Sequence, residues 1–319
     1  MVVASPNPNG NEKIQLVDLP VIDLSLPRSV VSKLIVKACE GYGFFMVINH
    51  GVPKEAISRM EEESLTFFSK TASEKQRAGP ANPFGYGSKN IGHNGDMGEV
   101  EYLLFNTDKA SIAQRCKTIS DDPTKFSSAV SDYIEAVREL ACELLEVIAE
   151  GLWVPDTSVF SRLITDVESD SVFRLNYYPP TSSSPTSKIG FGEHTDPQIL
   201  TLLRSNDVGG LQISPQDGVW VPVTSDPAAF CVNVGDALQA MTNGRFVSVR
   251  HRALTNSFKS RMSMALFSGP PLNATMKALP EMVTPENPLV YKPFTWAEYK
   301  KKTCSLRLGD SRLNLFRTS

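Results

Sequence analysis

Two hydrophobic periodicities divide the chain. In the first half, apolar residues recur at helical spacing in three segments, 29–41, 54–70 and 122–152, and this spacing predicts amphipathic helices. Two short apolar runs, 19–24 and 43–49, lie between or before these segments and indicate strands, the second of them buried. The first half is therefore predicted to be mainly helical.

From residue 171 the pattern changes to short β-type runs that are separated by turn residues. The seven runs are 172–178, 199–203, 211–213, 219–223, 230–234, 246–254 and 261–268. Strands of this number and spacing are typical of a β-sandwich or barrel. Residues 294–303 predict one late helix, with Thr295 as its N-cap.

This order of elements allows two organisations. Either a helical domain precedes a β domain, or a single β-barrel is supported by helices. We favour the second organisation, an α+β fold. Residues 79–98 interrupt both patterns because they are rich in Gly, Pro and Asn, so we predict a loop there. Loops of this length in a compact chain often carry function.

The composition and net charge indicate which kind of molecule the protein binds. The 319 residues are 41% hydrophobic and 21% charged, and 32 basic against 35 acidic residues give a net charge of −3. A weakly acidic chain is a poor match for nucleic acid or an anionic membrane surface, so a small-molecule substrate is expected. The oligomeric state stays open.

The cysteines and the N-terminus indicate a compartment. The five cysteines are scattered and form no C-x-x-C pair, which excludes a dense disulfide scaffold and a thiolate zinc site. The N-terminus has no basic start followed by an apolar stretch, and no run approaches the roughly 20 apolar residues of a membrane helix. We therefore expect a cytoplasmic protein without a membrane span.

Two of the four histidines fall in the strand-rich half. His194 and Asp196 are two residues apart, so on an extended chain they point to the same side. His251 shares a face with Val247 and Val249, which indicates an interior position. Taken by itself, His251 is best interpreted as a hydrogen-bonded core residue. The pair His194-x-Asp196 by itself is a weak signal, because H-x-D occurs by chance. Together, however, two imidazoles and one carboxylate form the facial set that binds iron(II).

An arginine on the next predicted strand strengthens this interpretation. Arg261 and Ser263 share one face of the run 261–268. A guanidinium inside a barrel requires an anionic partner, and a guanidinium beside a hydroxyl suits a carboxylate. Asn176 and Tyr178 share a face of the first strand and could reach the same ligand. The alternative for Arg261 alone is a surface salt bridge.

These residues resemble a known family. His194-x-Asp196, His251 and Arg261-x-Ser263 are similar to the motifs of the iron(II)/2-oxoglutarate-dependent dioxygenases, and Asn176-x-Tyr178-Pro-Pro180 to those of the plant branch. The resemblance implies a double-stranded β-helix (jelly-roll) core with helices on either side. It implies iron(II) on His194, Asp196 and His251, and 2-oxoglutarate on Arg261 and Ser263 with help from Tyr178 and Asn176. Dioxygen is the further cosubstrate, and ascorbate is expected to support turnover.

Further motifs resemble the gibberellin 2-oxidases, in particular those that act on nineteen-carbon gibberellins. They include Phe84-Gly-Tyr-Gly-Ser-Lys89, Glu101-Tyr-Leu-Leu104, Thr242-Asn-Gly-Arg-Phe246 and Leu308-Gly-Asp310. The resemblance implies hydroxylation at carbon 2 on the β face, which inactivates the hormone. It also implies three parts of one integrated unit: an N-terminal region 1–165, a jelly-roll core 166–272 and a C-terminal helical extension 273–319.

The substrate pocket is less well defined by the sequence. A gibberellin is a rigid apolar polycycle with a carboxylate, so its pocket requires an apolar lining and a few polar anchors. Lys89 and Tyr102 are the candidate anchors, and a solvated Lys89 is an equal alternative. The family commonly has a tryptophan where this chain has Glu99 in the same region. His50 and His93 are interpreted as a turn residue and an exposed loop residue.

Two other functions stay open at this point. One is the same chemistry on another plant metabolite, such as a flavonoid. The other is a catalytically dead member that binds a hormone or a metal. The intact iron and 2-oxoglutarate motifs argue against the second alternative.

Overall fold

The computed structural model describes residues 2–4, 13–92, 94–181, 187–216 and 218–318. Its helices are α1 Arg28–Gly41, α2 Lys54–Phe68, α3 Ala72–Gln76, α4 Lys109–Ile119, α5 Pro123–Gly151, α6 Ser161–Thr165, α7 Asp236–Met241 and α8 Trp296–Thr303, with the 3-10 turns η1 Pro280–Met282 and η2 Arg312–Phe316. No helix in these residues is both long and apolar enough to cross a membrane.

The strands form two main sheets. The larger sheet has the order β3 Val21–Asp23, β4 Phe44–Ile48, β12 Phe230–Val234, β9 Leu200–Ser205, β14 Arg261–Ser268, β7 Val172–Tyr178, β6 Met97–Asn106 and β5 Gly85–Asn90. The smaller sheet has the order β1 Val2–Ala4, β2 Lys13–Gln15, β11 Val219–Pro222, β10 Leu211–Gln216, β13 Arg250–Leu254 and β8 Ile189–His194. A short pair, β15 Thr275–Met276 and β16 Phe294–Thr295, lies near the C-terminus.

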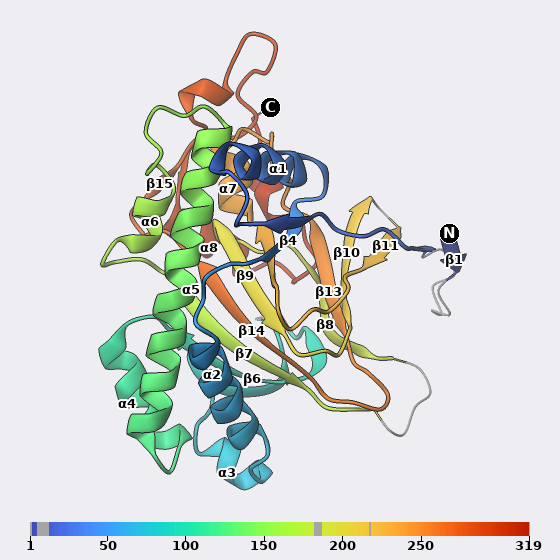
Figure 1. Cartoon of the computed structure of the whole chain (residues 1–319), viewed down its shortest axis with the longest axis vertical. Coiled ribbons are helices and arrows are strands. Elements are labelled where there is room, and N and C mark those ends of the chain that lie inside the picture. The colour runs from blue at the N-terminus through green and yellow to red at the C-terminus, as the bar shows by residue number, and fades with distance from the viewer. Residues whose placement is uncertain (1, 5–12, 93, 182–186, 217, 319) are drawn as a thin grey trace.

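The two sheets face each other as a double-stranded β-helix with helices on the outside, which confirms the predicted α+β fold. Strands from the first half of the chain, β3 to β6, complete the larger sheet around β7, β9, β12 and β14. Figure 1 shows the long helix α5 crossing the strands of the larger sheet at an angle, with α1, α2 and α4 beside it.

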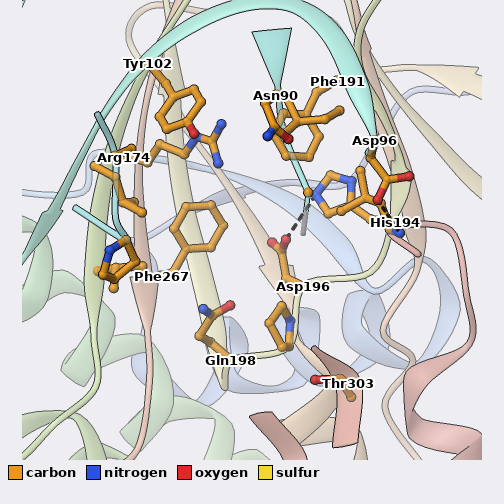
Figure 2. A pocket seen from close by; sticks show the side chains of 18 of the residues that line it. Asn90, Asp96, Tyr102, Arg174, Phe191, His194, Asp196, Gln198, Phe267 and Thr303 are labelled. Atoms are coloured by element: carbon orange, nitrogen blue, oxygen red, sulfur yellow. Dashed lines mark hydrogen bonds and ion pairs between the residues drawn. The ribbon is translucent and has the colours of Figure 1, made fainter. Parts of the chain in front are cut away.

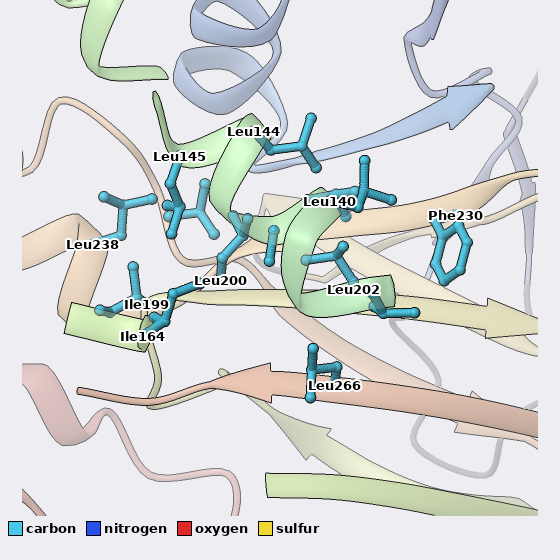
Figure 3. Close-up of a cluster of buried hydrophobic side chains, with 14 of the residues drawn as sticks. Leu140, Leu144, Leu145, Ile164, Ile199, Leu200, Leu202, Phe230, Leu238 and Leu266 are labelled. Carbon is cyan, nitrogen blue, oxygen red and sulfur yellow. The ribbon is translucent and has the colours of Figure 1, made fainter. Parts of the chain in front are cut away.

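The outer face of the larger sheet is buried by α5. Leu140, Leu144 and Leu145 of this helix belong to the same buried cluster as Leu200 on β9 and Leu266 on β14 (Figure 3). These side chains are at most 3% exposed. Full burial of a leucine contributes about 1.5–3 kcal/mol, so this helix holds the larger sheet in place and leaves the inner face free for a site.

Several predicted elements are confirmed. Strands β12 and β14 have the predicted bounds, and α5 begins and ends within one residue of its prediction. Thr295 is the N-cap of α8 and forms a capping box: its Oγ1 accepts from the N–H of Glu298 (3.2 Å), whose carboxylate accepts from the N–H of Thr295 (2.8 Å).

Other expectations were wrong. The predicted loop 79–98 contains β5, which pairs with β6 in an antiparallel hairpin. The backbone hydrogen bonds of β5 come from β6, so the Gly-rich sequence of this segment does not by itself indicate a strand. The predicted strand 246–254 begins only at Arg250, since the chain before it packs against α1, where the N–H of Val247 donates to the carbonyl of Cys39 (3.3 Å). Helices α3, α4, α6 and α7 and strands β6 and β8 were not predicted.

Candidate active site

The three predicted metal ligands meet at one end of the barrel. His194 ends β8 and is the direct cross-strand partner of His251 on β13, and their ring centroids lie 4.2 Å apart. Asp196 follows two residues after His194, and its Oδ1 lies 3.5 Å from the Nε2 of each histidine. One ligand atom from each residue lies within 4.8 Å of the others. Figure 2 shows the ring of His194 facing the carboxylate of Asp196 among the side chains that line the cavity.

Backbone carbonyls orient both imidazoles. Nδ1 of His194 lies 2.8 Å from the carbonyl oxygen of Gly192, and Nδ1 of His251 lies 3.2 Å from that of Val249. Because a carbonyl can only accept, each Nδ1 carries a proton, so Nε2 is the atom that each imidazole offers to a metal once the ring is neutral.

The carboxylate is oriented by residues that the sequence analysis missed. Oδ2 of Asp196 accepts from Oγ1 of Thr201 (2.7 Å) and from Nδ2 of Asn233 (2.8 Å). Thr201 and Asn233 are direct neighbours on β9 and β12, and both are buried. These bonds leave Oδ1 for the ion. Only strand pairing brings the two residues together, so no local pattern could have identified them.

Burial and mutual charge set the ionisation of this cluster. Burial, with His251 acting in the same direction, lowers the pKa of His194 to about 4. Burial lowers the pKa of His251 as well, but the Asp196 carboxylate outweighs it, so the net pKa lies above 6.5. Burial opposes ionisation of Asp196, but the two histidines hold its pKa well below 3.8. The site thus offers a carboxylate and a neutral imidazole.

Metal binding should therefore depend on pH through His251. A metal ion must displace the proton of this imidazole, and the raised pKa keeps that proton bound to a higher pH than usual. We expect the affinity of the apoprotein for Co(II) to rise by up to about tenfold per pH unit between about pH 6 and the pKa of His251. Anaerobic titration calorimetry at several pH values measures this slope, and an affinity independent of pH would contradict it.

A second constellation lies deeper in the barrel. Arg261 and Ser263 on β14 are the cross-strand partners of Tyr178 and Asn176 on β7. Nη1 of Arg261 donates to Oγ of Ser263 (3.3 Å), and Nδ2 of Asn176 donates to the same oxygen (3.4 Å). The guanidinium lies 5.1 Å from the ring centroid of Tyr178. The structure therefore brings together all four residues that the sequence indicated.

Among the residues that the structure describes, Arg261 has no anionic partner. Arg261 is 2% exposed, and its buried Nε has no hydrogen-bond partner in the described part of the chain. It forms no ion pair with any described residue, although a buried unpaired charge is costly. A cavity of about 60 Å³ joins Arg261 to the three metal ligands. This arrangement fits a ligand that carries one carboxylate toward Arg261 and binds the metal with its other end.

A larger cavity opens in front of the metal ligands. It has a volume of about 370 Å³, and Figure 2 shows its side chains arranged around His194 and Asp196. Its apolar lining includes Ile91, Leu104, Phe191, Phe267 and Leu308. A cavity of this size and character suits an apolar small molecule.

The sequence analysis overlooked a half-buried cation in the wall of this larger cavity that lies beside aromatic rings. The guanidinium of Arg174 lies 3.9 Å from the ring centroid of Tyr102 and 4.9 Å from that of Phe191. Its Nε donates to Oδ1 of Asn176 (2.7 Å), while its buried Nη2 has no partner among the described residues. A free donor of a buried guanidinium is an anion-binding group. The alternation of strand 172–178, which places position 174 on the face of Asn176 and Tyr178, could have identified it.

The two predicted substrate anchors differ in position. Tyr102 lines the larger cavity, whereas Lys89 lines neither this cavity nor the smaller one. The side chain of Lys89 is 62% exposed and lies 3.9 Å from the carboxylate of Glu99. Contact of Lys89 with a substrate stays a prediction. His50 accepts the N–H of Val52 (3.1 Å) as a turn residue, and His93 lies outside the described residues.

Comparison with known proteins places these features in a family. Residues 169–270 match the 2OG-Fe(II) oxygenase superfamily, and residues 19–123 match the non-haem dioxygenase N-terminal family, described from morphine synthesis. The chain is 57% identical to gibberellin 2-beta-dioxygenase 4 of Arabidopsis thaliana, over 97% of this chain and 98% of that protein. It is 50% identical to a gibberellin 2-beta-dioxygenase of Phaseolus coccineus, over 94% of this chain and 91% of that one.

Solved structures agree with this placement. The crystal structure of JOX2 in complex with 2OG, Fe, and JA superposes with a TM-score of 0.83 at 28% identity, over 96% of this chain and 90% of that one. A dioxygenase for auxin oxidation from rice superposes with a TM-score of 0.79 at 28% identity, over 94% and 100%. The chain uses iron(II), 2-oxoglutarate and dioxygen, and it belongs to the gibberellin 2-beta-dioxygenase family of the iron(II)/2-oxoglutarate-dependent dioxygenases.

Proposed function

We propose that this enzyme hydroxylates nineteen-carbon gibberellins at carbon 2 on the β face and thereby inactivates the hormone. The observation that carries this proposal is the extended identity to gibberellin 2-beta-dioxygenases, 57% over 97% of the chain. The cavity in front of the metal ligands, which is lined by both apolar and polar side chains, has room for a small polycycle. A half-buried cation, Arg174, lies in its wall.

In this proposal His194, Asp196 and His251 hold iron(II), each through the atom that its other hydrogen bonds leave free. Arg261 holds the far carboxylate of 2-oxoglutarate, while Ser263, Asn176 and Tyr178 support the guanidinium and the carboxylate. When bound, iron and 2-oxoglutarate supply the oxidising power: dioxygen is reduced, 2-oxoglutarate is decarboxylated to succinate, and one oxygen atom enters a substrate C–H bond. The protein itself orients both molecules and excludes water from the barrel.

Arg174 is proposed to anchor the carboxylate of the gibberellin. Its Nη2 is buried and has no partner in the described part of the chain, and the guanidinium lies against the ring of Tyr102. Tyr102 lies across the strand from Gly87, where a Cβ would come within 2.3 Å of the tyrosine ring. A glycine at this position therefore lets the ring lie against the hairpin, and the ring in turn directs Arg174 into the cavity.

Replacing Arg174 by glutamine should raise the KM for gibberellin. A hydrogen bond between charged groups contributes about 1.5–3 kcal/mol, so we expect a change on the order of 10- to 100-fold with the KM for 2-oxoglutarate little altered. Steady-state kinetics with each substrate varied in turn measures both values. Arg162→Gln is the matched control, because it removes an exposed guanidinium that pairs with Asp156 and lines neither cavity. An unchanged KM for gibberellin in Arg174→Gln would remove Arg174 from the substrate site.

Product analysis tests the proposed function. The protein is loaded with iron(II) without oxygen, then given 2-oxoglutarate, oxygen and a nineteen-carbon gibberellin. We expect a product heavier by one oxygen atom, with its hydroxyl on carbon 2 by NMR, and none from His194→Ala. If 2-oxoglutarate is consumed but the gibberellin is untouched, the substrate assignment fails and another plant metabolite takes its place.

We also infer that the protein works in a reducing compartment such as the cytoplasm. Cys39, Cys116, Cys142, Cys231 and Cys304 are all free thiols in the structure. Scattered free cysteines are usual in compartments that keep thiols reduced.

A further inference from the structure

The turn between two proposed metal ligands is held by segments that are far away in the sequence. Oγ1 of Thr195, the residue between His194 and Asp196, donates to Oδ2 of Asp236 (3.1 Å). The carbonyl of Thr195 accepts from Nη1 of Arg312 (3.3 Å). The N–H of Asp236 donates to the carbonyl of Asp196 (2.8 Å). Both the side chain and the backbone of this turn are therefore fixed from outside β8.

Tyr299 of α8 completes this arrangement. Its hydroxyl donates to the same Oδ2 of Asp236 that accepts from Thr195. Asp236 is 2% exposed and Tyr299 is fully buried. Burial and the Asp236 carboxylate raise the pKa of Tyr299 well above its usual value, so the tyrosine keeps its proton and stays a donor. Two donors thus hold one carboxylate oxygen in place.

Tyr299 is itself immobilised by aromatic packing. Its ring stacks on Trp296 at 5.3 Å and on Phe316 at 5.7 Å, with interplanar angles of 10° and 19°. Nε1 of Trp296 donates to Oδ2 of Asp170 (2.7 Å), just before β7. The C-terminal helix is therefore tied to the barrel by an oriented hydrogen bond as well as by burial.

The backbone also approaches this turn closely. A Cβ at Gly235, the residue before Asp236, would lie 2.0 Å from the carbonyl oxygen of Gln198 and 3.1 Å from that of Asp196. Only glycine permits this distance. The start of α7 is thus in direct contact with the chain that follows His194.

We propose that Asp236, Tyr299 and Arg312 are positioning residues of the metal site, and that they hold Thr195 so that His194 and Asp196 reach the ion together. This inference rests on the proposed role of the two ligands. It makes the C-terminal helical segment a part of the metal site, although none of its residues contacts the ion. Changes to residues that support metal ligands typically weaken metal binding 10- to 100-fold.

The variant Tyr299→Phe tests the proposal because it keeps the aromatic stack and removes only the hydroxyl. We expect anaerobic calorimetry to show Fe(II) binding to the apoprotein weakened by about tenfold or more. In turnover assays the iron concentration for half-maximal rate should rise by a similar factor, while kcat at saturating iron stays near that of the parent.

Tyr291→Phe is the matched control. Tyr291 is also buried and C-terminal, but its hydroxyl accepts from Nε2 of Gln239 (2.6 Å) and lies outside the Thr195 network. We expect this variant to keep the parent's iron affinity even if its thermal stability falls. Equal iron affinity in Tyr299→Phe and Tyr291→Phe would overturn the proposal.

Two further measurements keep the outcome unambiguous. Arg312→Gln shortens the side chain that holds the Thr195 carbonyl, so it should also weaken Fe(II) binding, and it replaces Tyr299→Phe if that variant does not fold. The parent and His194→Ala define the full range of affinity. If the parent binds no Fe(II), the metal assignment itself is wrong. If the parent binds Fe(II) and both variants match it, only the positioning role is wrong.

Discussion

Replacing His194 by alanine should abolish iron binding and hydroxylation together. The substitution removes one of three ligand atoms that lie within 4.8 Å of one another, so the loss of metal affinity should exceed the 10- to 100-fold typical of changes to supporting residues. Calorimetry with Fe(II) and succinate release with substrate present measure the two effects.

The fold should survive this change. The side chain of His194 is 13% exposed and lies at the rim of the cavity, so alanine opens space that water can enter. His50→Asn is the matched control: it removes an imidazole that accepts a backbone N–H in a turn, a role that asparagine can also fill. Parent-like iron affinity in His194→Ala, with an unchanged melting temperature, would place the metal elsewhere.

The second large effect is expected at Arg261. In Arg261→Met we expect the KM for 2-oxoglutarate to rise on the order of 100-fold or more, since hydrogen bonds between charged groups contribute about 1.5–3 kcal/mol each. The melting temperature of the ligand-free protein should stay unchanged or rise, because the substitution removes a buried charge without an ion pair among the described residues. The increase in melting temperature that 2-oxoglutarate produces in the parent should disappear.

A second buried arginine provides the contrast. Arg204 is 7% exposed and pairs with Glu61, so Arg204→Met leaves a carboxylate without its partner. We expect this variant to lose stability and to keep the parent's KM for 2-oxoglutarate. A fall in ligand-free stability in Arg261→Met, with unchanged 2-oxoglutarate binding, would show that Arg261 is a structural residue.

The candidate site shows which functional residues a local sequence pattern can identify and which it cannot. His194, Asp196, His251 and Arg261 were identifiable because their side chains are chemically distinctive and because period-2 alternation places each on a definite face. Thr201, Asn233 and Arg174 were not identified, since threonine, asparagine and arginine occur on many strands. Their roles depend on which strand lies beside them.

The substrate cavity depended even more on tertiary structure. Lys89 was a candidate from its place in a Gly-rich segment, but that segment forms β5, and the side chain of Lys89 is exposed beside Glu99. Arg174, a half-buried cation that does line the cavity, lies on β7. Whether a loop segment becomes an edge strand is decided by the strand it meets, and here that strand is β6.

By itself, the sequence determined the periodicity of each element and the chemical types at the site. It thereby predicted a strand-rich core supported by helices and a facial set of two imidazoles and one carboxylate, because these properties are local and follow from side-chain spacing. Only the tertiary structure decided the register that pairs His194 with His251, the contacts that orient Asp196 and the ionisation of the cluster. Strand register and burial depend on contacts between residues that are far apart in the chain. A local sequence pattern therefore cannot predict them.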